Sequence, residues 1–260
     1  MTLFSCRFVK LLRMNSRILT IGIIAALVGL TGGFLVANGL NRSTINALKT
    51  QLEQRGPAAN AKPGTTGDLT VDAQEIKTKI VEADANPTDM AFQKSLGRGL
   101  YRFATMKKDP ELVGEARRLL ERANSLDPND HDVLVDLGNA HFDIGYFNKD
   151  SASFKLARET YQKALASKPN DADVHTDYAL TFFVDEPSDL KKAVEEFQKA
   201  LKINPKQERA LQFLTSTHIR ESDFASATRT LSQLEAANSR NEAIVALKSQ
   251  IANQTYTPLQ

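Results

Sequence analysis

The residues of this chain that could perform chemistry are four histidines, one cysteine and two short acidic stretches. Catalysis would need a nucleophile beside a base, or two carboxyl groups tuned by their surroundings, and no such motif occurs. The single cysteine, Cys6, excludes a disulfide within the chain, and the histidines lack the spacing of a metal site. The acidic stretches 171–173 and 195–196 fit solvated helix faces and helix N-termini. The sequence therefore predicts a protein that is not an enzyme and holds no metal or cofactor.

The composition narrows the class of partner. With 33 Lys and Arg against 31 Asp and Glu, the net charge is only +2, and no long basic run appears. Nucleic-acid binding therefore has little electrostatic support. A hydrophobic fraction of 42% over 260 residues is ordinary for a globular protein, so a sizeable core can form.

An apolar segment near the N-terminus, residues 18–40, contains no charged residue. Its 23 residues, at about 1.5 Å per residue in a helix, are long enough to cross a bilayer. The alternative is a cleaved signal peptide, whose apolar region is usually shorter and ends in an A-x-A-like site. Leu35-Val36-Ala37 matches such a site poorly. We therefore expect a retained transmembrane helix that places the chain in the lipid bilayer.

Basic residues are more numerous before this segment than after it. Before it stand Arg7, Lys10, Arg13 and Arg17, and after it Arg42 and Lys49. The positive-inside rule keeps the N-terminal tail, residues 1–17, in the cytoplasm. It predicts a single-pass inner-membrane protein with an extracytoplasmic, periplasmic domain. If translation begins at Met14, only Arg17 remains before the segment and the charge argument nearly vanishes.

Small residues recur at every fourth position along the predicted membrane helix. They are Ala25, Gly29, Gly33 and Ala37, and such a face lets two helices approach closely. In a juxtamembrane helix expected over residues 41–55, Ile45, Leu48 and Leu52 have the spacing of a short coiled coil. Small residues are common in membrane helices in general, so a homodimer and a monomer both remain open. Residues 56–70 are rich in Gly, Pro and Thr and predict a flexible linker.

The remainder, residues 71–254, is an internally repeated domain. Pro87, Pro128, Pro169 and Pro205 are spaced by 41, 41 and 36 residues. Small residues keep the same register in two further series, Gly97, Gly138, Ala179 and Thr215 in one and Ala116, Ala157, Ala193 and Ala227 in the other. Prolines that end helices, and small residues that let helices approach, predict about four units of two helices each.

These units resemble the tetratricopeptide repeat (TPR), a 34-residue helix-turn-helix with a Leu-Gly pair in its first helix and A-x3-F in its second. Leu137-Gly138 and Ala193-x3-Phe197 carry the resemblance most clearly. It implies an all-α TPR superhelix. The first two units contain seven extra residues between their small-residue positions, so either their helices or their turns must be longer. Capping helices are expected at both ends, over Ile76, Ile80 and Ala83 and over Ile244, Leu247 and Ile251.

Two stretches, residues 137–143 and 170–177, are also similar to membrane-anchored TPR proteins of bacterial cytochrome c biogenesis. This resemblance implies a docking subunit that holds an apocytochrome tail or a haem-ligation partner. The alternative is a generic cell-envelope assembly or chaperone-like TPR scaffold with no link to cytochromes.

In either case we expect a protein or peptide partner in the concave groove lined by the first helices. The repeat register places one apolar residue of each unit on that face, and the four are Tyr101, Phe142, Phe183 and Ile219. Lys94, Arg98 and Arg102 lie beside them at one end, Asn139 and Asp143 in the middle, and Gln212, Ser216 and Arg220 at the other end. Apolar positions with basic ends suit a peptide with apolar anchors and an acidic end. The alternative is that the four apolar residues only pack between adjacent helices.

Overall fold

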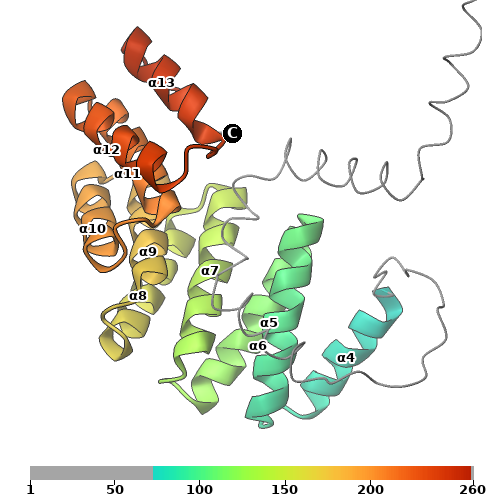
Figure 1. The fold of residues 1–260 in the computed structure, drawn as a ribbon. Helices are drawn as coiled ribbons and strands as arrows, with labels where there is room; N and C mark the ends of the chain where they lie inside the picture. The colour runs from blue at the N-terminus through green and yellow to red at the C-terminus, as the bar shows by residue number, and fades with distance from the viewer. Residues whose placement is uncertain (1–72, 259–260) are drawn as a thin grey trace, which may run out of the picture.

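The computed structural model describes residues 73–258, which form a curved row of ten helices without a strand (Figure 1). With the labels of Figure 1, the helices are α4 (Ala73–Ala85), α5 (Met90–Lys107), α6 (Pro110–Leu126), α7 (His131–Asn148), α8 (Ser151–Ser167), α9 (Ala172–Val184), α10 (Leu190–Ile203), α11 (Glu208–Arg220), α12 (Phe224–Ala237) and α13 (Ala243–Asn253). None of these helices is long and apolar enough to cross a membrane. The predicted tail, membrane helix, juxtamembrane helix and linker fall outside the described residues.

The helices form four antiparallel pairs, α5/α6, α7/α8, α9/α10 and α11/α12, with one further helix at each end. Consecutive first helices also touch one another, whereas second helices contact mainly the first helices on either side. This asymmetry bends the row, with α5, α7, α9 and α11 on the inner side. The predicted all-α superhelix of two-helix units is confirmed.

The repeated prolines end helices as expected. A helix stops two residues before each of them, at Ala85, Leu126, Ser167 and Ile203. The residue before a proline is disfavoured in the α conformation, which accounts for the constant offset. Helix α12 ends two residues before Ser239, so the fourth unit keeps the same boundary without the proline.

Helix starts are marked by aspartates. The side chains of seven of them accept hydrogen bonds from backbone N–H groups of the helix that follows, and they are Asp89, Asp109, Asp130, Asp150, Asp171, Asp189 and Asp223. Each such N-cap stabilises its helix by about 1 kcal/mol. Asp109 is followed by Pro110 at the first helical position, where the missing N–H of proline costs no hydrogen bond.

The two enlarged units owe their size to longer helices. Helices α5 and α7 have 18 residues each, against 13 in α9 and in α11. Helices α6 and α8 have 17 residues, against 14 in α10 and in α12. The turns inside the enlarged units are short, because Lys108 and Lys149 adopt left-handed conformations (φ 54° and 52°) and the next residue already caps the following helix.

The core is a series of clusters between neighbouring helices. Ala116, Ala157, Ala193 and Ala227 are completely buried, as their place in the repeat predicts. Gly138 is pressed against the buried ring of Tyr161, so that a Cβ added there would lie 2.5 Å from a ring carbon. At the ends, Ile76 and Ile80 of α4 pack against the Leu100 cluster, and Ile244 and Leu247 of α13 pack against the Leu211 cluster. The predicted end helices are therefore present.

Two glycine-to-alanine substitutions test this packing. We expect Gly138→Ala to destabilise the domain, because overpacking typically costs about 1–3 kcal/mol and outweighs the gain in helix propensity. Gly99→Ala is the matched control in α5, where an added Cβ meets nothing within 4 Å. It should stabilise by about 0.5–1 kcal/mol. Urea unfolding of both variants measures the difference, and equal effects would contradict the close approach at Gly138.

Candidate functional site

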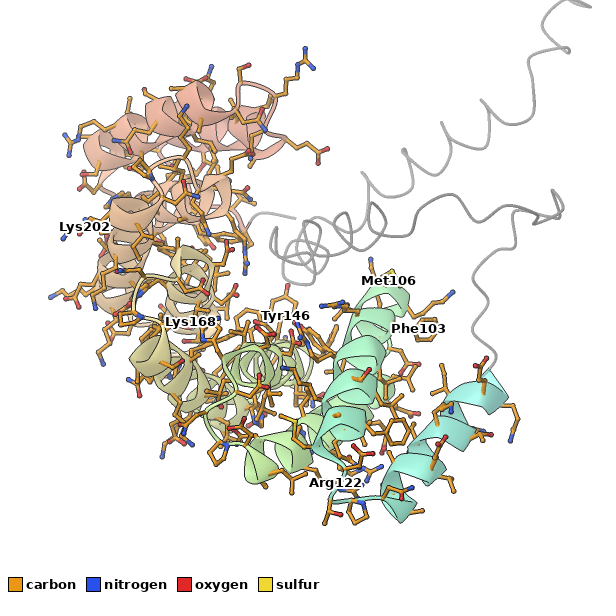
Figure 2. The ribbon with its side chains drawn as sticks, turned by 60° about the horizontal axis from the view of Figure 1, so that its bottom comes forward. Phe103, Met106, Arg122, Tyr146, Lys168 and Lys202 are labelled. Carbon is orange, nitrogen blue, oxygen red and sulfur yellow. The ribbon has the colours of Figure 1, made fainter. Side chains whose placement is uncertain are left out.

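The candidate site is the inner face formed by the four first helices, here called the inner helices. They meet along three lines of contact, which we call the first seam (α5–α7), the middle seam (α7–α9) and the last seam (α9–α11). Figure 2 shows Tyr146 of α7 pointing to the hollow side of the row, whereas Arg122 and Lys202 lie on its outside. The polar contacts across the seams determine which charged side chains of this face are already paired within the protein.

The first seam is closed by ion pairs. Lys94 Nζ lies 2.6 Å from Asp130 Oδ2, and Arg98 lies 3.1 Å from Asp132 and 2.5 Å from Asp136. Burial raises the pKa of the Asp136 carboxyl, and Arg98 opposes that rise. Two of the three cations expected to form a basic end are thus neutralised within the fold, and the third, Arg102, is partly buried.

The last seam is closed in the same way from the opposite side. Arg209 Nη2 of α11 lies 2.5 Å from Asp177 Oδ1 of α9, and Gln207 Nε2 donates to Asp173 Oδ1 over 2.9 Å. Arg220 donates to the carbonyl oxygen of Phe183 and to Glu186, each over 2.7 Å. Its guanidinium also lies 5.6 Å from the ring of Phe183 and 5.7 Å from that of Tyr256, so the C-terminal segment is fixed at this end.

The middle seam differs because each of its helices carries a buried carboxyl group, Asp143 on α7 and Asp177 on α9, and the charge of Asp177 acts on Asp143. Asp143 is completely buried, and its Oδ2 accepts a 2.8 Å hydrogen bond from the Tyr101 hydroxyl. Its Oδ1 has no hydrogen-bond partner. Among the residues that the structure describes, Asp143 forms no ion pair, although the charges of Asp177 across the seam and of Arg209 on α11 both act on it.

Burial dominates the ionisation of this pair. It raises the pKa of Asp143 to about 7, the negative charge of Asp177 adds to the rise, and the Tyr101 hydrogen bond and Arg209 oppose it. Burial likewise raises the pKa of Asp177 to about 6 against the attraction of Arg209. Burial and Asp143 raise the pKa of Tyr101, which keeps that hydroxyl protonated so that it can donate. The middle seam therefore holds two carboxyl groups that ionise near neutral pH.

The four apolar residues expected on the groove surface lie inside the protein. Tyr101 and Phe142 are each 1% exposed, Ile219 is 2% exposed and Phe183 is 6% exposed. Phe142 packs edge-on against Phe154 of α8, and Phe183 packs edge-on against Phe213 of α11. The structure thus gives them a packing role, which favours the alternative already considered, and their part in partner binding stays a prediction. The aromatic side chain exposed on this face is Tyr146, which is 43% exposed and stacks on Phe142.

Asp177, Arg209 and Tyr146 were not among the expected site residues, yet a signal for the aspartate was present. Asp130, Asp132 and Asp136 recur 41 residues later as Asp171, Asp173 and Asp177. The repeat thus places the same aspartates on α7 and α9. The lysine and arginine side chains that pair with Asp132, Asp136 and Asp177 come from α5 and α11. Across the inner face, α5 and α11 therefore contribute the basic side chains, and α7 and α9 between them contribute the acidic ones.

Two of the four histidines, His131 and His175, have hydrogen-bond partners within the fold. His175 lies between Glu196 Oε2, at 2.7 Å, and the carbonyl oxygen of Pro169, at 3.1 Å. His131 Nε2 lies 3.1 Å from the N-cap carboxylate of Asp171. Burial, with the charge of Arg117, lowers the pKa of His141 to about 4, so that this ring is neutral at physiological pH. Within residues 73–258 no three His, Cys, Asp or Glu side chains are grouped closely enough to hold a metal ion.

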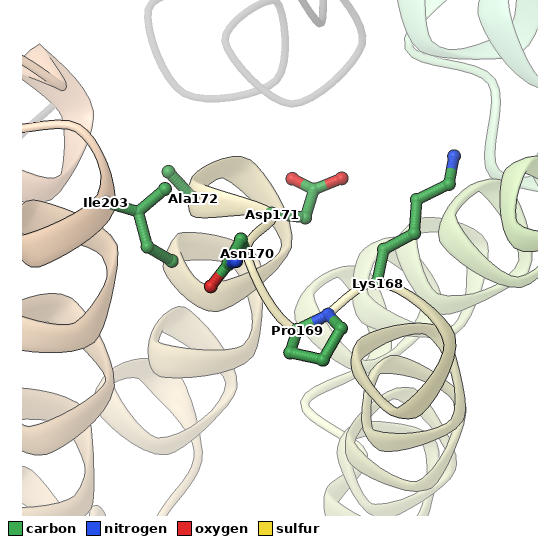
Figure 3. Close-up of a pocket in the computed structure, with 6 residues that line it drawn as sticks. All are labelled: Lys168, Pro169, Asn170, Asp171, Ala172 and Ile203. Atoms are coloured by element: carbon green, nitrogen blue, oxygen red, sulfur yellow. The ribbon is translucent and has the colours of Figure 1, made fainter.

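A shallow pocket of about 480 Å³ lies at the turn between α8 and α9 (Figure 3). It is lined by Lys168, Pro169, Asn170, Asp171, Ala172 and Ile203. Asp171, at the edge of this pocket, is the N-cap of α9. Its carboxylate already accepts hydrogen bonds from the backbone N–H groups of Asp173 and Val174. The pocket is therefore a hollow beside a helix start whose exposed donors are already satisfied.

The stacked helix pairs form a superhelix like that of tetratricopeptide-repeat proteins. Residues 186–251 match the family model described as tetratricopeptide repeat, and residues 84–187 match the model described as plant-specific mitochondrial import receptor subunit TOM20. The two enlarged units and helix α9 thus fall within the second model, and helices α10 to α12 with most of α13 fall within the first. A comparison with curated proteins finds no match.

Solved structures share the fold at low sequence identity. The chain is similar to a MamA RS-1 ArsTM double mutant, with a TM-score of 0.52, 17% identity and coverage of 82% of this chain and 99% of that one. It is also similar to TTC0263, a thermophilic TPR protein of Thermus thermophilus, with a TM-score of 0.50, 12% identity and coverage of 69% and 96%. At such identities the likeness concerns the fold alone.

The buried carboxyl of Asp143 predicts an unusual dependence of stability on pH. Its pKa is about 7 in the folded chain against 3.8 as the ordinary value, so the folded state keeps a proton that the unfolded state releases. Its contribution to stability is therefore fully present at acidic pH and is lost as the pH rises to about 7. Asp177 also stabilises the folded chain at acidic pH, and its contribution is lost as the pH rises to about 6.

We expect the free energy of unfolding to fall between about pH 4 and pH 7 by as much as a few kcal/mol, since one pKa unit corresponds to about 1.36 kcal/mol. Asp143→Asn should flatten this profile and be more stable than the native chain at about pH 8. Chemical denaturation across the pH range measures both. Glu115→Gln, an acid on the outer helix α6, is the control and should keep the native slope.

Proposed function

We propose that this chain is a non-enzymatic scaffold whose inner face binds a segment of another polypeptide. The observation that carries this proposal is the construction of that face. Ion pairs hold the inner helices together along the first and last seams, while Tyr146 is exposed on the hollow side beside the buried carboxyl groups of the middle seam. A preorganised face of this kind binds without first ordering itself, which favours affinity.

Two further considerations support a polypeptide ligand. Stacked helix pairs form long curved surfaces that suit an extended or helical segment. The model matched by residues 84–187 is named for an import receptor subunit, which agrees with the recognition of a polypeptide. Within this proposal the similarity of residues 137–143 and 170–177 to cytochrome c biogenesis proteins makes an apocytochrome tail one partner to test. A cell-envelope assembly partner is the alternative.

Photo-crosslinking from two equally exposed positions tests the binding face. Tyr146 on the inner side is 43% exposed, and Leu156 on the outer helix α8 is 45% exposed. With a benzophenone amino acid at each position in the full-length chain, we expect partner adducts from position 146 and few from position 156. Their yields are compared by mass spectrometry of purified complexes from the native host.

Equal adducts from the two positions, or adducts from position 156 alone, would contradict binding at the inner face. The identity of the crosslinked peptides also separates the two classes of partner. Peptides from an apocytochrome or a haem-ligation protein support a role in cytochrome c maturation. Peptides from unrelated envelope proteins support the generic scaffold.

We also propose that residues 18–40 anchor the chain in a membrane, with the repeat domain on the extracytoplasmic side. The support is the length of the uncharged segment and the excess of basic residues before it. The small-residue face of Ala25, Gly29, Gly33 and Ala37 would bring two copies together. Crosslinking in intact membranes that detects only monomer would contradict this homodimer.

Deleting residues 18–40 tests the anchor. The full-length chain should stay in the membrane pellet after alkaline carbonate extraction, because a spanning helix resists conditions that strip peripheral proteins. The shortened chain should move to the supernatant, as judged by immunoblotting of both fractions. Deletion of the predicted linker, residues 56–70, is the control and should leave the chain in the pellet. A shortened chain that still pellets would show that the anchor lies elsewhere.

A further inference from the structure

We infer that the middle seam is a subsite for one cationic side chain, a lysine or arginine of the bound polypeptide, which pairs with Asp143 and Asp177. This inference rests on the proposed function and deepens it by naming the chemistry of the ligand. The sequence had suggested a peptide with an acidic end, because Lys94, Arg98 and Arg102 were expected to form a basic end of the groove. A cationic ligand is the opposite of that expectation. Lys94 and Arg98 already pair with aspartates of α7 and its N-cap.

The first argument is the charge pattern of the inner face. Arg98 is placed against Asp132 and Asp136, and Arg209 is placed against Asp177. The repeat supplies aspartates on both α7 and α9, but their arginine partners reach in from α5 and α11. The centre of the face is consequently the place where one more positive charge would be stabilised.

The second argument is an unused hydrogen-bond acceptor at that centre. Asp143 Oδ1 is buried without a partner, although the other oxygen of the same carboxyl accepts from Tyr101. An unsatisfied buried acceptor costs about 1–3 kcal/mol, so a donor supplied by a ligand would recover that loss. An ammonium or guanidinium group offers both the donor and the charge that a pair of neighbouring carboxyl groups favours.

The third argument concerns access. Tyr146 lies one helical turn beyond Asp143 on α7 and is the exposed aromatic group of this face. Its ring can pack against the aliphatic stem of an approaching lysine or arginine or make a cation–π contact with its charged group. Among residues 73–258, ion pairs with arginine join α5 to α7 and α9 to α11, whereas no such pair joins α7 to α9. The contact between the ends of these two helices is His131 with Asp171. The middle seam is therefore the one that can open most easily for a ligand.

The groups around Asp143 fix the expected pH dependence of binding. They are Tyr101 from α5, Tyr161 from α8, Asp177 from α9 and Arg209 from α11. A bound cation requires the carboxylate form, whereas the free chain holds a proton on Asp143 below about pH 7. Binding therefore releases a proton, and affinity should rise with pH by up to about tenfold per unit below that value and level off above it.

The test uses the full-length chain and a phage-displayed library of random dodecapeptides, selected at about pH 8, where the carboxyl groups are ionised. We expect the enriched peptides to share a lysine or arginine at one fixed position. A synthetic peptide and its analogue with norleucine or citrulline at that position are then titrated at about pH 6 and pH 8 by calorimetry. The cationic peptide should bind at least about tenfold more tightly than the neutral analogue at the higher pH.

Two variants locate the effect. Asp143→Asn should weaken binding of the cationic peptide by about tenfold or more at pH 8 and abolish the pH dependence, because the amide cannot supply the charge. A loss of folding does not explain that result, since this variant is expected to be at least as stable there. Glu115→Gln on outer helix α6 should bind as the native chain does.

Enriched peptides without a basic residue, or an Asp143→Asn variant of native affinity, would overturn the cationic subsite. If such peptides are still captured at position 146, the proposed binding face stands and only the subsite fails. If the library yields no binding peptide and position 146 gives no adducts, the proposed function fails together with the subsite.

Discussion

The close approach of the two helices in each unit is the constraint from which the rest of the structure follows. Gly138 can lie against the ring of Tyr161 only because glycine has no Cβ, and Gly97 lies in the same way against Leu119 and Leu120. A pair of helices packed this tightly behaves as one rigid element. Each pair still leaves one apolar side uncovered, so neighbouring pairs must stack to bury it, and the end helices α4 and α13 cover the last open sides.

The stacking brings the first helices together on one side, and this has an electrostatic consequence. A repeat copies its charged residues into successive helices, so like charges tend to face each other across a seam. In this chain the copied aspartates of α7 and α9 are balanced by arginines from the two flanking inner helices. Arg209 pairs with Asp177, whereas Asp143 is buried without an ion pair among the described residues, where the charge of Asp177 also acts on it. Burying charges in this way raises the pKa of each group towards neutrality.

This arrangement separates the residues that hold the fold from those that can serve a partner. Tyr101, Phe142, Phe183 and Ile219 are packed inside, and Lys94 and Arg98 lock the first seam. With the proposed cationic subsite, a face that is neutralised at its ends would take a ligand whose positive charge lies in the middle of its sequence rather than one with an acidic end. The same seam is where acid pH stabilises the folded chain, because a protonated carboxyl there removes a buried charge.

The sequence by itself determined the all-α class, the units of 41, 41 and 36 residues, and the places where helices end before prolines. These features are local, since a proline, an N-cap aspartate or a glycine acts on its own helix and on the neighbour that the repeat implies. The tertiary structure alone decided that the extra residues lengthen the helices, that the four apolar residues turn into the core, and that Lys94 and Arg98 already have partners. The reason is that residues three or four positions apart share one face of a helix, so the repeat register cannot say which side of that face meets the next unit. Only the stacking of the units decides this, and it lets the charge of Asp177 act on Asp143, which lies 34 residues earlier in the sequence.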